Sequence, residues 1–172
     1  MKNIDLRQAV TILSNIGMIA GIAQPESYTG GLTQSPRSNR PRGRLRAGLT
    51  DEARLMNHRQ FEAAVRRAMN GLPDWVHAAL ENIEIIVLDE ADQVLDPERQ
   101  GLLGLYVGLP LPERGVDYAG ELPDVIYLFR KPHLKLNLSP HDLRREIAKT
   151  LIHEIAHYFG IDDDHLEELG WG

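Results

Sequence analysis

Two histidines and a glutamate near the end of the chain have the types and spacing needed for metal-assisted hydrolysis. They lie in the segment TLIHEIAHYFGIDDDH, residues 150–165. His153 and His157 are four residues apart, so on a helix they share one face and both imidazoles can bind one ion. Glu154 follows about 100° round the helix, close enough to take a proton from a metal-bound water. Because zinc lowers the pKa of such a water from about 15.7 toward about 7, the pattern predicts a zinc-dependent hydrolase with Glu154 as general base.

A third ligand is expected from the residues just after this helix. Gly160 follows the second histidine by three residues, and glycine readily adopts the left-handed conformation that turns the chain back. Asp163, three residues after Gly160, is the first candidate. Its carboxylate would join the two imidazoles and leave a fourth coordination position open. His165, two residues further on, is the second candidate. Asp162 and Asp164 compete as well, unless the aspartates cap a new helix.

The motif belongs to the best-capped helix that the sequence predicts. Ser139 supplies an N-cap, Pro140 suits the first helical position, and Gly160 ends the helix. On a helical wheel the large apolar residues lie on one side, and the histidines lie on the other with two polar neighbours. The apolar side holds Ile147, Leu151, Ile155, Tyr158 and Phe159, and the opposite side holds Glu146, Thr150, His153 and His157.

Other elements must hold this helix in place. Asn57 and Gln60 form a capping-box pattern at the start of a helix that ends at Asn70-Gly71. A second short helix is expected within 72–82, with Trp75 and Val76 facing inward. Short β-branched or apolar runs predict three strands, at 83–88, 102–108 and 125–130, with a long loop at 109–123. This order predicts an α+β domain.

The chain of 172 residues divides by composition. Residues 1–55 are expected to be a largely disordered, basic N-terminal extension, because 24–50 are rich in Gly, Pro, Ser and Arg. Met56 is an alternative start. Residues 56–172 form the predicted domain. Residues 1–50 carry a net charge of +5 and the remainder −11, so the acidic body argues against nucleic acid as a partner. The expected partner of a zinc-dependent peptidase is instead a peptide or protein substrate. The oligomeric state is not readable.

Cysteine is absent from the sequence, so a transition metal would have to be held by His, Asp or Glu. A run of about 18 apolar residues is also absent, and we therefore expect no membrane span. The apolar segment 9–23 resembles a signal peptide, but Asp5, Ser14 and Asn15 interrupt that pattern. A cytoplasmic location is therefore expected.

Three segments resemble the small bacterial zincin-like metallopeptidase family: LLGLYVGLPLPERG, GELPDVIYLFR and TLIHEIAHYFGIDDDHLEELGW. The resemblance spans about Met56 to Gly172. It implies a minimal zincin-like α+β fold, in which a small mixed sheet packs on the HExxH helix. It also implies zinc bound by His153 and His157, Glu154 as the catalytic residue and Asp163 as third ligand.

The sequence departs from larger zincins in two ways. The last methionine is Met69, so a methionine turn beneath the metal is excluded. The tyrosine that often stabilises the oxyanion has no assigned counterpart. Tyr118, in the long loop, is the candidate, whereas Tyr106, Tyr127 and Tyr158 are expected to pack in the core.

Two other functions remain open from the sequence. If Asp163 and His165 both bound zinc, the site would be closed, as in a non-catalytic zinc-stabilised binding module. A metal-dependent endoribonuclease has a related histidine spacing, but Glu154 and the acidic body argue against it. The other histidines, His58, His77, His133 and His141, are expected at the surface.

Overall fold

The computed structural model describes residues 56–80, 82–115 and 123–168. The predicted N-terminal extension, residues 1–55, and Tyr118 lie outside these ranges. The elements in chain order are α3 (His58–Asn70), α4 (Asp74–Ala79), β1 (Ile83–Leu88), β2 (Gly104–Val107), the 3-10 helix η1 (Leu111–Glu113), β3 (Asp124–Phe129), α5 (Arg130–Lys135), α6 (Pro140–Tyr158) and α7 (Asp163–Glu168). The predicted α+β architecture is confirmed, and α5 is a helix that the sequence pattern did not indicate.

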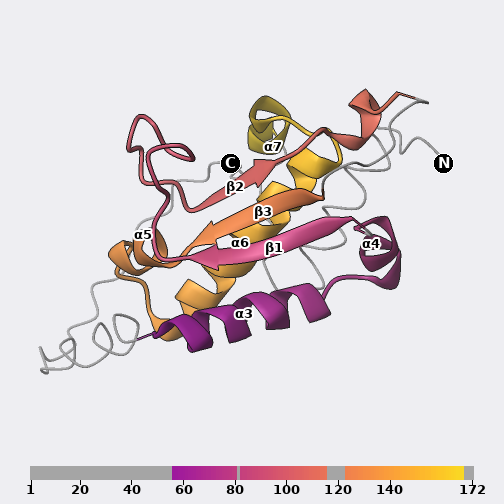
Figure 1. Ribbon diagram of the computed structural model, residues 1–172. Coiled ribbons are helices and arrows are strands. Elements are labelled where there is room, and N and C mark those ends of the chain that lie inside the picture. Colours follow the sequence, from indigo (N-terminus) through magenta and orange to yellow (C-terminus); the bar gives the residue numbers. More distant parts are fainter. Residues whose placement is uncertain (1–55, 81, 116–122, 169–172) are drawn as a thin grey trace, which may run out of the picture.

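The three strands form one small mixed sheet in the order β1-β3-β2. β1 pairs parallel with β3, and β2 pairs antiparallel with β3. Figure 1 shows α6 running behind the sheet and α3 lying beside β1. The edge strand β2 lies next to α6, which places its backbone beside the helix that carries the histidines.

The hydrophobic core lies between one face of the sheet and the helices α3 and α6. The predicted apolar side of α6 is buried there, with Ile147, Leu151 and Ile155 fully inaccessible. Ile126 and Leu128 meet them from β3. Both predicted helix starts are confirmed, since Asn57 and Gln60 form a capping box and Ser139 caps α6. The core therefore fixes α6 so that Glu146, His153 and His157 on its polar side stay partly exposed, whereas Thr150 on the same side is buried.

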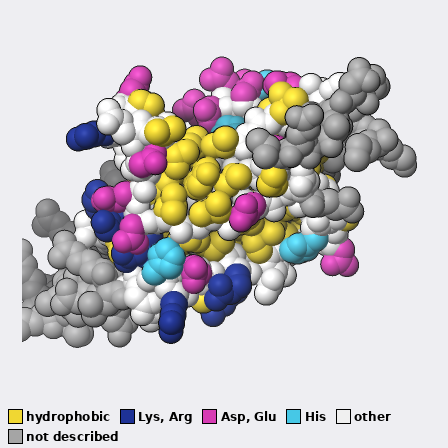
Figure 2. All heavy atoms as spheres, viewed as in Figure 1, with side chains coloured by type: hydrophobic (Ala, Val, Ile, Leu, Met, Phe, Trp, Pro, Cys, Tyr) yellow, Lys and Arg dark blue, Asp and Glu magenta, His cyan; other side chains and the backbone are white. Residues whose placement is uncertain are grey.

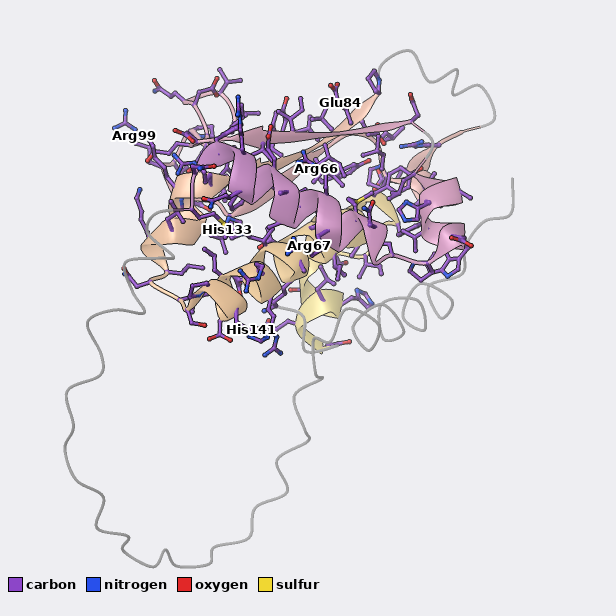
Figure 3. All side chains as sticks on the ribbon, turned by 90° about the horizontal axis from the view of Figure 1, so that it is seen from below. Arg66, Arg67, Glu84, Arg99, His133 and His141 are labelled. Atoms are coloured by element: carbon purple, nitrogen blue, oxygen red, sulfur yellow. The ribbon has the colours of Figure 1, made fainter. Side chains whose placement is uncertain are left out.

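The opposite face of the sheet is apolar and is not covered by any helix among the described residues. Its residues are Glu84, Ile86, Leu88, Leu105, Val107, Val125, Tyr127 and Phe129. Figure 2 shows hydrophobic side chains gathered over the strands with an acidic side chain among them, and Figure 3 shows Glu84 on the side away from α3 and α6. The apolar run of β1 predicted a buried strand, but only alternate residues reach the core.

Two expectations about individual side chains are wrong. Trp75, expected to face inward, is 39% exposed, whereas its neighbour Val76 is fully buried. His133, expected at the surface, is 0% exposed because α5 packs it between α3 and α6 (Figure 3). Its ring meets the edge of Phe61, and its Nε2 lies 3.1 Å from Oγ1 of Thr150.

None of the helices in the described part of the chain has the length and apolar character to cross a membrane.

Candidate metal centre

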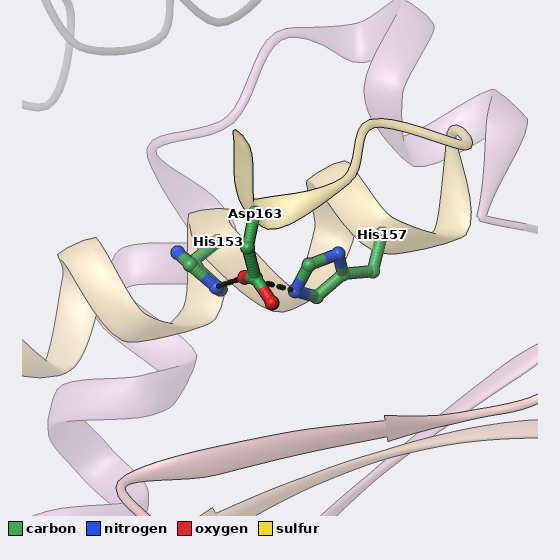
Figure 4. Close-up of side chains that lie close together, drawn as sticks. All are labelled: His153, His157 and Asp163. Atoms are coloured by element: carbon green, nitrogen blue, oxygen red, sulfur yellow. Dashed lines mark hydrogen bonds and ion pairs between the residues drawn. The ribbon is translucent and has the colours of Figure 1, made fainter. Parts of the chain in front are cut away.

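Three predicted ligands meet on the polar side of α6, at the point where the chain folds back over the helix (Figure 4). Oδ1 of Asp163 lies 3.1 Å from Nε2 of His153 and 3.4 Å from Nε2 of His157. One ligand atom from each of the three residues lies within 4.8 Å of the other two. Two imidazole nitrogens and one carboxylate oxygen are a donor set that zinc accepts. The residues therefore fit the metal that the sequence predicts.

The turn after α6 is formed by local backbone hydrogen bonds. Gly160 has a φ of +84°, and its N–H donates to the carbonyl of His157. The N–H of Ile161 donates to the carbonyl of Ala156, which completes a Schellman motif. This reversal, predicted from the glycine, brings Asp163 back to the histidines.

The same turn orients one of the candidate ligands. Nδ1 of His157 lies 2.8 Å from the carbonyl oxygen of Ile161. A carbonyl can only accept, so Nδ1 carries the proton and donates it. The lone pair of Nε2 is then left for a metal, which is the usual arrangement of a metal-binding histidine.

His165, the alternative third ligand, is held elsewhere. Its Nδ1 lies 2.7 Å from Oδ1 of Asp162, and the same carboxylate oxygen accepts the His165 backbone N–H at 2.9 Å. This contact to Asp162 raises the pKa of the His165 imidazole, the hydrogen bond being the main cause. Asp162 therefore caps α7, as one reading of the aspartates anticipated. Asp163, and not His165, is the residue that the fold brings to the two histidines.

Glu154 lies on the same helix but is turned toward the sheet. It is 6% exposed. The pKa of its carboxyl is raised to about 7, mainly by burial; a hydrogen bond from the Tyr106 backbone N–H acts in the opposite direction, and the negative charge of Asp163 adds to the rise. The side chain is thus a poised acid–base group in a partly desolvated position.

A cleft of ≈ 420 Å³ runs between β2 and the polar side of α6. The backbone of Gly104 approaches α6 so closely that a side chain would not fit. A β-carbon there would lie 2.6 Å from Oε1 of Glu154 and 2.8 Å from Cγ2 of Thr150. The cleft is lined by Leu102, Leu103, Gly104, Leu105, Tyr106, Glu146, Lys149, Thr150, His153, Glu154, His157 and Asp163. The four polar-side residues predicted from the helical wheel all belong to this lining.

The prediction for Tyr118 is not tested by the structure, whereas Tyr106 has a role beyond the packing expected of it. Tyr118, the oxyanion candidate, lies outside the described residues. Tyr106, expected only to pack, also lines the cleft and supplies the backbone donor to Glu154. The alternation of β2 accounts for this: Leu103 pairs with β3 through its carbonyl, so the backbone groups of Gly104 and Tyr106 point to the free edge.

A family model described as "Zincin-like metallopeptidase" matches residues 80–171, more than half of the chain and the whole segment from β1 to α7. None of the curated proteins compared with the chain matches it.

Proposed function

Because the chain belongs to the zincin-like metallopeptidase family, we propose that it hydrolyses peptide bonds in the cleft between β2 and α6 with a zinc ion and Glu154. The observation that carries this proposal is the convergence of His153, His157 and Asp163 within 4.8 Å, at the mouth of a cleft that Glu154 also lines.

The metal would be held by Nε2 of each histidine and a carboxylate oxygen of Asp163. When bound, zinc supplies a Lewis acid and lowers the pKa of a water at its open position. The hydrogen bond from Nδ1 of His157 to Ile161 supports this assignment, because it leaves Nε2 unprotonated. Asp163 is 81% exposed along its side chain, so this side of the centre faces solvent and can admit a substrate.

Glu154 would carry the proton between water and the leaving amine. Its carboxylate is fixed from one side by the Tyr106 N–H, and its pKa of about 7 in the metal-free protein lets it hold or release a proton near neutral pH. The contact with Gly104 holds it close to the sheet. The Tyr106 hydrogen bond and the contact with Gly104 limit the rotamers of Glu154, whose carboxylate must reach both the water and the nitrogen of the leaving amine.

The free edge of β2 would hold the substrate. β2 pairs with β3 along one edge, and by alternation the N–H and carbonyl of Gly104 and the carbonyl of Tyr106 point to the other. An extended peptide can add to such an edge by main-chain hydrogen bonds. The scissile bond would then lie between β2 and the histidines, which is the position that general-base attack requires.

The deciding experiment replaces Glu154 with glutamine. Glu154→Gln should bind zinc as the unmodified chain does but cleave a fluorogenic peptide library about 10²–10⁴ times more slowly, because only the proton transfer is lost. Glu62→Gln is the control, since Glu62 lies on α3 and outside the lining of the cleft. It should retain activity within a few-fold.

A full peptidase rate in Glu154→Gln contradicts the role given to Glu154. Stoichiometric zinc in the unmodified chain, without cleavage of any peptide in the library, would instead identify a non-catalytic zinc-binding module.

A further inference from the structure

Arg114, in the loop between β2 and β3, joins three separate parts of the fold. Its Nε donates to the carbonyl of Leu109 at 2.8 Å, and its guanidinium forms an ion pair with Asp124 at the start of β3. The guanidinium carbon lies 5.0 Å from the centre of the Tyr158 ring, near the end of α6. The Arg114 side chain is 13% exposed and that of Asp124 is 4% exposed. Screening by water is therefore weak, and these contacts fix Arg114 firmly against Asp124 and Tyr158.

Asp124 connects Arg114 to Tyr106 of β2, whose backbone contacts Glu154 of α6. The hydroxyl of Tyr106 donates to Oδ2 of Asp124 at 2.9 Å, the same oxygen that pairs with Arg114. The backbone N–H of Tyr106 donates to the Glu154 carboxylate. One residue of β2 is thus tied at its side chain to the Arg114 ion pair and at its backbone to the proposed general base.

The same loop also supports the turn that carries the third ligand. A β-carbon on Gly160 would lie 2.7 Å from Cγ of Pro112, so η1 and the turn after α6 are packed in direct contact. Gly160 stands three residues before Asp163, and its N–H donates to the His157 carbonyl in the turn that meets Pro112. A shift of η1 would therefore be transmitted to Asp163.

We propose that Arg114 is a positioning residue of the metal centre. By anchoring the loop 109–114, it holds the Tyr106 N–H against Glu154 and the Gly160 turn against Pro112. The inference rests on the proposed function for the meaning of Glu154 and Asp163, although the metal readouts below do not require peptidase activity. Arg114 itself touches neither a ligand atom nor the scissile bond in this arrangement; it acts through Asp124, Tyr106 and the loop.

The first test is Arg114→Lys in the full chain. Lysine keeps the positive charge beside Asp124 but loses the planar fork that reaches Leu109, Asp124 and Tyr158 together. We expect a zinc dissociation constant about ten-fold higher by chelator competition, in the range seen when outer-shell partners of a metal site are removed. The visible absorption bands of the cobalt-substituted protein should change as well, because they report the ligand geometry. Peptidase kcat should fall by about the same factor, with KM less affected.

Arg130→Lys is the matched control. Arg130 also pairs with an aspartate and a backbone carbonyl, Asp89 at 2.7 Å and Met56 at 3.1 Å, but it does not line the cleft. It should leave zinc affinity, the cobalt spectrum and kcat as in the unmodified chain. A second variant, Pro112→Ala, keeps the Arg114 pair and removes only the ring carbons that meet Gly160. It should weaken zinc binding and alter the cobalt spectrum.

Wild-type zinc affinity and cobalt spectrum in a folded Arg114→Lys protein would overturn the inference and leave Arg114 with a purely stabilising role. If Arg114→Lys does not fold, Pro112→Ala decides: an unchanged metal site in that variant overturns the coupling of the loop to Asp163. Absence of peptidase activity in the unmodified chain would defeat the proposed function alone, because the metal readouts still test Arg114.

Discussion

Oδ1 of Asp163 lies 3.1 Å from Nε2 of His153, although the two residues belong to different helices, α7 and α6. The contact exists because the chain reverses at Gly160 and returns along the polar side of α6. It makes the third position of the proposed metal centre dependent on a tight turn, and it distinguishes Asp163 from Asp162 and Asp164 as the candidate ligand.

Replacing Asp163 with alanine should therefore weaken zinc binding strongly. We expect a loss of at least about 100-fold, the upper end of the range for an outer-shell partner, because a direct ligand is removed. His165→Ala is the control, since His165 is engaged with Asp162. Chelator competition measures the zinc affinity of both variants. A larger loss of affinity in His165→Ala than in Asp163→Ala would make His165 the third ligand instead.

Zinc removal should lower the stability of the folded protein. A ligand that binds only the folded state, at a free concentration 100 times its dissociation constant, adds about 2.7 kcal/mol to the free energy of unfolding. Urea unfolding with buffered zinc and with chelator should differ by about this amount in the unmodified chain and in Glu154→Gln. The difference should be much smaller in Asp163→Ala. Equal unfolding midpoints with and without zinc would contradict a site formed only by folding.

Gly104→Ala should impair catalysis without abolishing zinc binding. The added β-carbon would lie 2.6 Å from Oε1 of Glu154, so the carboxylate must move away from the Tyr106 N–H. We expect kcat/KM to fall about ten-fold or more and the free energy of unfolding to drop by about 1–3 kcal/mol, as for other overpacked sites. Gly115→Ala is the control, because a β-carbon there meets no atom within 4 Å.

His133 should make the protein less stable below neutral pH. Burial lowers the pKa of its imidazole, with the hydrogen bond to the Phe129 carbonyl acting in the opposite direction. As pH falls below about 6.5, the unfolded chain takes up a proton that folded His133 does not, so stability decreases by up to about 1.4 kcal/mol per pH unit.

His133→Phe isolates this effect. At pH 8 the variant should be less stable by about 1–3 kcal/mol, because it loses the hydrogen bonds to Phe129 and Thr150. The deficit should shrink between pH 7 and pH 5 as the unmodified chain loses stability. Urea unfolding at several pH values measures both curves, with His77→Gln as a substitution at an exposed histidine. A deficit that grows toward acid pH would contradict the assignment.

The parts of the fold predicted correctly depend on residues close in sequence. The capping box of Asn57 and Gln60 and the cap of Ser139 are hydrogen bonds across three residues, so the side chains that form them are visible in the sequence. The Gly160 turn is local in the same sense. The placement of His153 and His157 side by side follows from helical spacing alone, so it was predictable once the helix was placed.

The errors concern residues whose surroundings come from distant segments. His133 is buried because α5 lies against α3 and α6, and nothing in its own neighbourhood indicates those partners. Tyr106 matters through its backbone N–H, which every residue possesses, so its side chain gave no signal. The choice between Asp163 and His165 was left open for a different reason: both lie in the short helix α7, where the structure places Asp163 beside His153 and pairs His165 with Asp162.

The order of the strands has a consequence for how the chain can fold. Among the described strands, β1 pairs with β3, beyond the whole of β2 and η1, so pairing them closes a longer loop than pairing β2 with β3 and costs more conformational entropy. β2 and β3 are sequential antiparallel neighbours, and α6 forms from local hydrogen bonds. During synthesis, β1 leaves the ribosome well before the strand it needs, and the sheet is completed only after Phe129 has emerged. When the protein starts to unfold, β1 should therefore detach first, while α6 is still packed against the antiparallel pair β2 and β3.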